Sequence, residues 1–285
     1  MGSVPARRSI SIQASMGSQP PTSPPPYFAR GPFLSPRTRG RRGLKSRIRM
    51  SDASLLSSAR ESPSVLRPSE YTAALIQAVQ AEAEWVRGAS VLEIGSGSGV
   101  VLAAVAALGA ASICGIDIEQ DAVVSGRVLL HELGHGGVAE FHHGDLWEPV
   151  LGRRFDLIVA NLPHFPMASN HVPGRLPSWS AGGPDGRYLL DPFLDGLGRH
   201  LMPLGRAIIT HNAFVSLERS CEMVARHGLA LRVVSTTLVY IPGDKLDCMS
   251  SHILEAEDGR SIHRYGPYAF GEMHIVEIGA PGAVD

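Results

Sequence analysis

The sequence has no run of about 18 apolar residues, the shortest stretch with which a helix crosses a membrane, so no membrane-spanning helix is expected. The N-terminus also lacks the apolar core of a secretory signal. Cysteines are few: Cys114, Cys221 and Cys248 show no C-x-x-C spacing, and their odd number favours a reducing compartment over a disulfide scaffold. These absences predict a cytoplasmic protein that binds no membrane.

Acidic residues are missing from residues 1–50, which hold nine Arg and one Lys among many Ser and Pro. Low hydrophobicity with high charge predicts a disordered basic tail. An Arg-rich, Ser-rich, acid-free N-terminus also fits an organelle import signal, and a translation start at Met50 is a third interpretation. From Ser51 onward there are 16 basic and 27 acidic side chains, a formal net charge of −11. The part of the chain that folds is therefore acidic.

Short apolar runs alternate with segments of helical periodicity from about Pro63 onward. Parallel strands need a crossover connection, so this alternation predicts an α/β fold: a doubly wound, Rossmann-like sheet, mostly parallel, with an antiparallel strand near the C-terminus. The predicted strands are residues 90–95, 112–118, 139–145, 155–163, 205–214, 229–240 and 273–279, and the predicted helices are 68–86, 100–109, 120–134, 186–201 and 216–228. Ligands of such sheets lie beyond the carboxyl ends of the strands.

Polar and glycine residues occur where the first three predicted strands end. The stretch "VLEIGSGSG" carries Glu93 and then Gly95, Gly97 and Gly99, which allow the backbone to approach a ligand closely. Asp117 follows 22 residues after Gly95, a spacing that suits a carboxylate on the hydroxyls of a ribose. Asp145 ends the third strand, where a carboxylate can accept from an exocyclic adenine amine. Together these positions predict a nucleotide-like ligand.

The fourth strand ends in "FDLIVANLPHFP", and with it the sequence resembles a known family. The stretches "RPSEYTAALIQAV", "GIDIEQDAV", "GDLWEP" and "SWSAGGPDGRYLLDPFLDGL" extend the resemblance from about Arg67 to Phe214. The chain is similar to the class I S-adenosylmethionine-dependent methyltransferases. Within them it most resembles the branch whose fourth strand ends in Asn-Pro-Pro-Tyr, and especially the glutamine methyltransferases that act on translation release factors.

The resemblance implies S-adenosylmethionine as cofactor and no metal. It places Glu93, Gly95, Gly97 and Gly99 on the methionine and ribose side, Asp117 on the ribose and Asp145 on the adenine, and it makes Asn161, Pro163 and His164 the catalytic motif, with Asn161 also beside the cofactor. A planar nitrogen is a poor nucleophile because its lone pair is delocalised. If the Asn161 side chain and the carbonyl of residue 162 accept its two N–H bonds, the nitrogen is held toward the methyl group, and catalysis is mostly positioning and desolvation.

The motif departs from the family at two positions, since Leu162 replaces a proline and His164 replaces the aromatic residue. Leu162 keeps its carbonyl. His164 could stack on a planar group or act as a base for an O–H or N–H, and Phe165 could supply aromatic surface. The expected acceptor is a protein or a small molecule with a planar nitrogen. Methylation of a specialised metabolite, nucleic-acid methylation and a non-catalytic S-adenosylmethionine-binding protein are the alternatives, and the acidic charge disfavours nucleic acid.

Four segments are expected: the tail 1–50, N-terminal helices in 51–88, a cofactor-binding core in 89–239, and a final part in 240–285. This final part would be a lid followed by the last strand, and its residues 241–272 have no counterpart recognised in the family. Tyr240, Tyr265, Tyr268 and Phe270 could belong to a substrate lid, or the segment could simply cover the edge of the sheet.

Two histidine patterns are interpreted as structural. His131, Glu132 and His135 spell the H-E-x-x-H of zinc proteases, but Gly134 is expected to end the helix before His135. The same helix is expected to turn Ala122, Gly126, Leu129 and Leu133 toward the sheet. His211 and Asn212 end the fifth large strand and are expected to have a hydrogen-bonded structural role.

Overall fold

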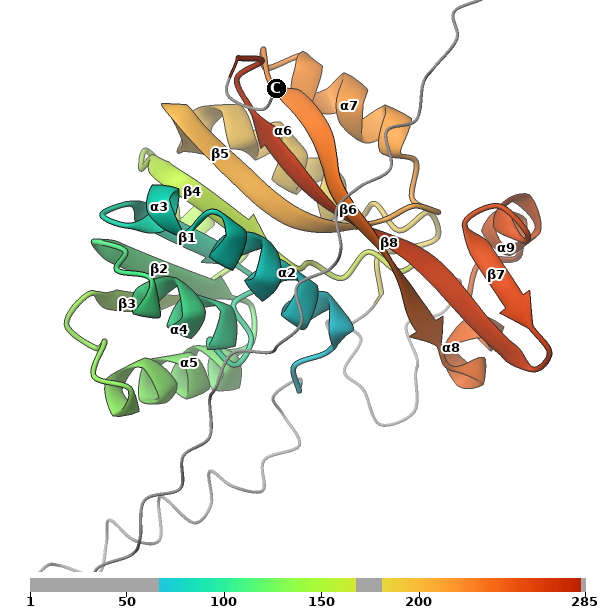
Figure 1. Cartoon of the computed structure of the whole chain (residues 1–285), viewed down its shortest axis with the longest axis horizontal. Coiled ribbons are helices and arrows are strands. Elements are labelled where there is room, and N and C mark those ends of the chain that lie inside the picture. The colour runs from blue at the N-terminus through green and yellow to red at the C-terminus, as the bar shows by residue number, and fades with distance from the viewer. Residues whose placement is uncertain (1–66, 168–180, 283–285) are drawn as a thin grey trace, which may run out of the picture. The chain divides into compact units, whose positions relative to one another are not determined.

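The computed structural model describes residues 67–167 and 181–282, so the predicted tail lies outside the described residues. Their strands form one sheet in the order β3-β2-β1-β4-β5-β8-β6, with β7 paired to β8 (Figure 1). The strands are β1 (Ser90–Ile94), β2 (Ser112–Asp117), β3 (Ala139–His143), β4 (Phe155–Ala160), β5 (Leu201–Asn212), β6 (Ala230–Ile241), β7 (Ile262–Tyr265) and β8 (Tyr268–Gly279). Strands β1 to β5 pair in parallel, whereas β8 is antiparallel to β5 and β6. The predicted α/β fold with an antiparallel strand near the C-terminus is confirmed.

Helices cover both faces of this sheet, because successive strand residues point to opposite sides. In β4, Leu157 and Val159 pack with α2 (Glu70–Ala81) and α4 (Val100–Ala107), while Ile158 and Ala160 pack on the other side. The remaining helical elements are α3 (Ala83–Val86), α5 (Gln120–Glu132), the 3₁₀ turn η1 (Glu148–Val150), α6 (Leu190–His200), α7 (Leu217–Ala225), α8 (Gly243–Asp247) and α9 (Ser251–Glu257). Figure 1 shows α2, α4 and α5 on one face and α6 and α7 on the other. Within the described ranges, no helix has the length and apolar character to span a membrane.

The end of α5 agrees with the prediction for the H-E-x-x-H stretch. The helix stops at Glu132, Gly134 follows with φ 82°, and His135 lies beyond it. Two histidines four residues apart therefore do not share one helical face here. The predicted buried stripe was partly wrong: Leu130 is buried, while Leu133 is 53% exposed. Leu133 is the C-cap residue, so the helical period that would turn it inward ends before it.

The C-terminal part is more structured than the sequence suggests. Strand β8 begins at Tyr268 rather than at residue 273, and α8, α9 and β7 were not predicted. The twelve-residue strands β6 and β8 run past the other strands and carry these elements at their far end (Figure 1). The segment packs on the loop after β4, where the Ser250 N–H donates to the Pro166 carbonyl at 3.0 Å and Met167 forms a β-bridge with Met249.

Candidate active site

Three candidate residues predicted from the sequence lie together at the carboxyl ends of three neighbouring strands. We call this end of the parallel strands the edge of the sheet. Glu93 lies in β1, Asp117 ends β2 and Asn161 follows β4, and these strands are adjacent in the order β2-β1-β4. Their carboxyl ends coincide because all three run in parallel. Asp145 follows β3, the next strand outward, and its side chain is exposed.

Two polar side-chain atoms at this edge are buried without a hydrogen-bond partner among the described residues. Glu93 is 2% exposed and its Oε2 atom makes no hydrogen bond; the Oγ atom of Ser96, 4% exposed, makes none either. Burial, together with the charge of Asp117, raises the pKa of Glu93 well above its ordinary value. Leaving such groups unpaired is costly. The pair therefore fits a ligand that brings a positive or hydrogen-bonding group to β1, as the sulfonium and ammonium groups of S-adenosylmethionine would.

The glycines after β1 serve different purposes. A Cβ on Gly97 would meet nothing within 4 Å, and the Gly97 N–H donates to Asp117 Oδ2 at 2.8 Å. This arrangement leaves open space at Gly97, whose backbone is bonded to the Asp117 carboxylate. Gly99 instead faces α5, where an added Cβ would lie 2.7 Å from the Cα of Gly126. The absence of a side chain at Gly99 thus permits close packing against α5. Gly95 lies against Leu162, whose Cδ2 atom an added Cβ would approach to 3.4 Å.

Asn161 is held by a residue that the sequence analysis missed. Thr210 of β5 is buried, and its hydroxyl donates to Asn161 Oδ1 at 2.8 Å. The amide oxygen has a second lone pair, which stays available. The next peptide group presents only its carbonyl to a ligand, because Pro163 has no N–H. Asn161 and the Leu162 carbonyl are thus two hydrogen-bond acceptors on consecutive residues.

The environment of His164 fits neither of the roles suggested by the sequence, a stacking surface or a base. The side chain is 4% exposed, its Nε2 atom accepts from the Asn212 N–H at 2.9 Å, and its Nδ1 atom lies 2.5 Å from the Leu162 carbonyl oxygen. Burial lowers the pKa of His164 to about 4. A buried neutral ring with both nitrogens bonded offers neither a stacking surface nor a free base. The two roles considered from the sequence are therefore not supported.

The end of β5 forms the frame behind His164. The Tyr71 hydroxyl of α2 donates to Asn212 Oδ1 at 2.7 Å, and His211 Nδ1 lies 2.9 Å from the Asn212 carbonyl oxygen. Asn212 therefore has bonds at its N–H, its carbonyl and its side chain. The structural role expected for His211 and Asn212 agrees with this geometry, and Tyr71 was recognisable only as part of the "RPSEY" stretch.

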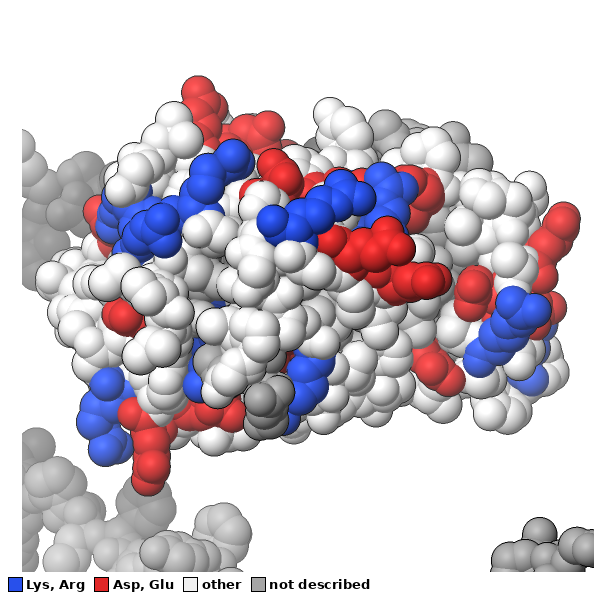
Figure 2. Space-filling view, turned by 90° about the horizontal axis from the view of Figure 1, so that it is seen from above, with Lys and Arg blue, Asp and Glu red and all other residues white. Residues whose placement is uncertain are grey.

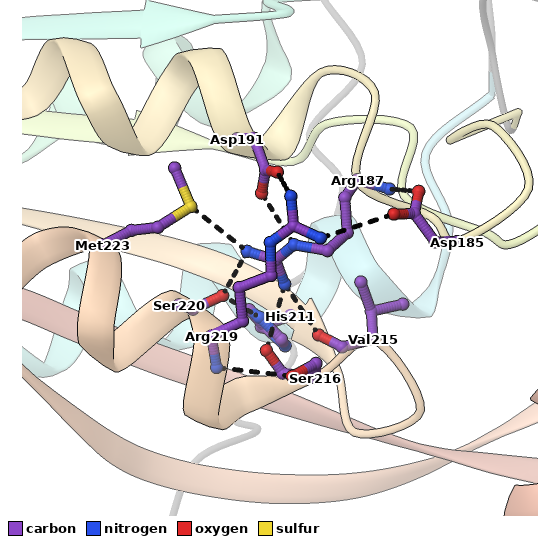
Figure 3. A network of polar contacts seen from close by, with 9 residues as sticks. All are labelled: Asp185, Arg187, Asp191, His211, Val215, Ser216, Arg219, Ser220 and Met223. Carbon is purple, nitrogen blue, oxygen red and sulfur yellow. Dashed lines mark hydrogen bonds and ion pairs between the residues drawn. The ribbon is translucent and has the colours of Figure 1, made fainter.

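Arg187 is a further buried residue that the sequence analysis missed. It is 3% exposed, and its guanidinium donates to Asp191, to the carbonyls of Val215 and Ser216, and to Ser220 Oγ (Figure 3). The Ser220 oxygen in turn lies 2.9 Å from His211 Nε2. The loop before α6, the start of α7 and the end of β5 are thus joined by one polar network.

One cluster away from this edge has the composition of a metal site. Ligand atoms of Cys114, Glu140 and His142 lie within 4.8 Å of one another. The guanidinium of Arg153 already pairs with Glu140 and approaches the Cys114 sulfur to 3.9 Å. A cation thus occupies the cluster, and burial raises the pKa of the Cys114 thiol to about 12. The geometry describes an ion-pair cluster, and we assign it no metal.

Comparisons with known proteins agree with a cofactor-binding site at the carboxyl ends of β1, β2 and β4. A family model described as a methyltransferase domain matches residues 91–173. The chain is 34% identical over 172 residues to a provisionally named protein N5-glutamine methyltransferase of Methanocaldococcus jannaschii, covering 60% of this chain and 84% of that protein. It is 29% identical to the release factor glutamine methyltransferase of Moorella thermoacetica, over 55% of this chain and 54% of the relative, so it spans about half of that protein.

A solved structure supports the fold. The YcgJ protein of Bacillus subtilis superposes with a TM-score of 0.52 at 17% identity, covering 73% of this chain and 99% of that one. At this identity the likeness concerns the fold alone. Together with the sequence match across most of the archaeal relative, it establishes that the chain belongs to the S-adenosylmethionine-dependent methyltransferases, in the family that includes the protein N5-glutamine methyltransferases.

Proposed function

We propose that this enzyme transfers the methyl group of S-adenosylmethionine to the side-chain amide nitrogen of a glutamine in a protein. The observation that carries the proposal is the pair of consecutive acceptors, Asn161 Oδ1 and the Leu162 carbonyl, at the carboxyl end of β4. A primary amide has two N–H bonds in one plane. Two hydrogen-bond acceptors on consecutive residues can receive both N–H bonds, whereas a substrate hydroxyl group has only one O–H to donate. The relatives named as glutamine methyltransferases support the same class of acceptor.

The residues of this chain contribute orientation. S-adenosylmethionine supplies an electrophilic methyl group, and its sulfur keeps the electron pair of the broken bond. Asn161 and Leu162 hold the amide so that the nitrogen lone pair points at the methyl carbon. Once the new N–C bond has formed, the nitrogen is cationic and readily loses one proton to solvent. No strong base has to act before transfer, which agrees with a buried, neutral His164.

Charge supports a protein acceptor over a nucleic acid. A nucleic-acid enzyme needs a basic face that neutralises phosphates. From Ser51 onward the chain has a formal net charge of −11, and in the view of Figure 2 basic and acidic side chains lie beside one another instead of forming a basic stripe.

The C-terminal segment 240–285 is proposed as one wall of the acceptor site. It touches the motif loop through Ser250 and Met249, and the Lys245 ammonium lies 4.3 Å from the centroid of the Phe165 ring. Because the segment packs on the loop after β4, it would lie next to any methyl acceptor that Asn161 binds. The unpaired state of Cys114, Cys221 and Cys248 supports the cytoplasm as the proposed location.

Methyl-labelled S-adenosylmethionine tests the acceptor. The enzyme is incubated separately with a purified peptide-chain release factor, with total RNA and with a mixture of small amines, and the product is located by mass spectrometry. We expect label on one glutamine side chain of the release factor and none on a variant with that glutamine changed to glutamate. Label in RNA or on a small molecule, with none on protein, would contradict the proposed acceptor while leaving the methyltransferase assignment intact.

Thr210 gives a second test, because its hydroxyl orients Asn161. The near-isosteric change Thr210→Val removes one hydrogen bond and is expected to lower kcat about 3- to 10-fold, the range that corresponds to one net hydrogen bond. Thr210→Ser keeps the hydroxyl and is expected to stay close to the unmodified enzyme. Equal rates for Thr210→Val and Thr210→Ser would show that Asn161 does not depend on Thr210.

A further inference from the structure

We infer that His164 is a positioning residue, which fixes the direction of the Leu162 carbonyl so that this oxygen can accept one N–H of the methyl acceptor. The inference rests on the proposed role of Asn161 and Leu162. It replaces the two functions that the sequence suggested for His164, a stacking platform and a base. Three sets of contacts carry it: the directions of the hydrogen bonds of His164, the frame around Asn212, and the buried network that ends at Arg187.

The hydrogen-bond directions at His164 follow from one backbone group. The Asn212 N–H can only donate, so Nε2 of His164, at 2.9 Å, must be the unprotonated nitrogen. The proton of the neutral ring is then on Nδ1, which donates to the Leu162 carbonyl at 2.5 Å. This short bond occupies one lone pair of the carbonyl oxygen. The other lone pair remains for the acceptor, in a direction set by the ring.

The frame around Asn212 keeps that N–H in place. Asn212 is 2% exposed, lies in β5 and pairs with Met273 of β8. Its side-chain oxygen receives the Tyr71 hydroxyl of α2 at 2.7 Å. The position of the His164 ring is therefore set jointly by the sheet and by helix α2.

The hydrogen bonds that link Arg187, Ser220, His211 and Asn212 can run in only one direction each. The Asn212 carbonyl can only accept, so a neutral His211 carries its proton on Nδ1 and donates it to that carbonyl at 2.9 Å. His211 Nε2 is then an acceptor, and Ser220 Oγ, which accepts from the Arg187 guanidinium at 3.1 Å, donates its own proton to Nε2. Figure 3 shows Arg187, Ser220 and His211 in this order. The N–H of Asn212 is thus bonded to His164 and its carbonyl to His211, and each histidine is held in a single tautomer.

The nearby charges agree with a neutral His164. Burial is the main cause that lowers its pKa, and the cationic Lys245 and Arg187 act in the same direction. Tyr71 and His211 are the other titratable groups whose rings lie beside it, at centroid distances of 6.1 and 6.3 Å. Burial raises the pKa of Tyr71 and lowers that of His211, so both stay neutral near pH 7. No carboxylate of the described residues contacts the ring.

Three substitutions of His164 separate positioning from the other roles. His164→Asn keeps an amide N–H near the place of Nδ1, His164→Gln keeps an acceptor near the place of Nε2, and His164→Phe keeps only a ring. We expect His164→Asn to retain kcat within about 10-fold, and His164→Gln and His164→Phe to lose about 100-fold, because a displaced acceptor group costs rates of this order. The dissociation constant for S-adenosylmethionine is expected to stay within a few-fold in all three.

Each other role predicts a different pattern. A stacking platform would make His164→Phe the most active of the three variants. A base would make all three equally slow, and the unmodified enzyme would lose rate as the pH falls through the pKa of the base. A purely structural role would make the loss of rate follow the loss of Tm. Any of these three results would overturn the inference.

The tautomer of His164 provides a readout that needs no acceptor. The ¹⁵N chemical shifts of the imidazole distinguish a proton on Nδ1 from one on Nε2, and we expect Nδ1–H for His164 and His211 at neutral pH. Detection of Nε2–H at His164 would overturn the inference by itself. If glutamine proves to be the wrong acceptor, the tautomer is unchanged and the kinetic series is run on the acceptor that carries the label, so the two failures are distinguishable.

Discussion

Replacing Asn161 with alanine is expected to lower kcat for methyl transfer by about 100-fold or more, since a misplaced reacting group costs rates of this size. The variant loses the acceptor that Thr210 orients, and with it one of the two contacts that fix the amide plane. The dissociation constant for S-adenosylmethionine, measured by calorimetry, is expected to change much less than kcat. The transfer itself is followed as the mass gain of the labelled acceptor.

Leu162 supplies the matched control for Asn161. Leu162→Met alters the neighbouring side chain with little change in volume and keeps the backbone carbonyl, so transfer is expected to remain close to that of the unmodified enzyme. An Asn161→Ala variant that methylates as fast as the unmodified enzyme would show that the motif after β4 does not bind the acceptor.

Replacing Glu93 with glutamine is expected to have opposite effects on stability and on cofactor binding. The Glu93 carboxylate is buried with one oxygen unpaired, and its pKa in the folded protein is raised. Ionised Glu93 therefore destabilises the cofactor-free fold, so the variant should have a higher Tm than the unmodified protein at neutral pH. The affinity for S-adenosylmethionine should fall about 10- to 100-fold, the range for one hydrogen bond to a charged group.

The pH dependence gives the sign of the stability effect. Above the raised pKa, Glu93 is ionised in both the folded and the unfolded state, and the full penalty is present. As the pH falls toward about 4, the ordinary value for glutamate, both states become protonated and the penalty disappears. The difference in Tm between Glu93→Gln and the unmodified protein is thus expected to be largest at high pH and to shrink on acidification.

Glu277 is a matched control, because it is also 2% exposed but fully paired. Its two oxygens bind Arg206 at 2.7 Å and Arg232 at 2.5 Å. Glu277→Gln removes the anion that pairs with Arg232 and leaves Arg206 only its longer contact with Glu82 at 3.5 Å, so it is expected to lower the Tm at neutral pH. A lower Tm for Glu93→Gln as well would mean that Glu93 is satisfied in the cofactor-free protein, against the present interpretation.

The sequence predicted the positions of those candidate site residues that follow from local pattern. Glu93, Asp117 and Asn161 each end or follow an apolar run, and parallel strands bring such ends to one edge whatever the details of packing. Gly99 shows the limit of this reasoning, because the glycine spacing does not reveal that Gly99 packs against Gly126 of α5. A glycine in the sequence indicates that a side chain does not fit at that position, but it does not identify the neighbouring atoms that leave no room for it.

The contacts that the sequence did not reveal join residues that lie far apart in the chain. Tyr71 and Asn212 are 141 positions apart, and Arg187 reaches Ser220 over 33. No local period relates such residues, because the sheet and the helix packing bring them together. His164 was found, but its function was not, since its tautomer is set by an N–H of β5 that no sequence pattern connects to the motif.

The place of β8 between β5 and β6 has a consequence for the order in which the chain folds during synthesis. Strands β1 to β4 pair only with one another and with β5, so they can form their part of the sheet as soon as they leave the ribosome. Strands β5 and β6 do not pair with each other, and both pair with β8, which is synthesised after them. Until residues 268–279 emerge, the exposed edge of β5 has no partner and Asn212 lacks its neighbour Met273. The frame around Asn212 that positions His164 is therefore completed last, so a nascent chain is expected to form its cofactor-binding half before it can transfer a methyl group.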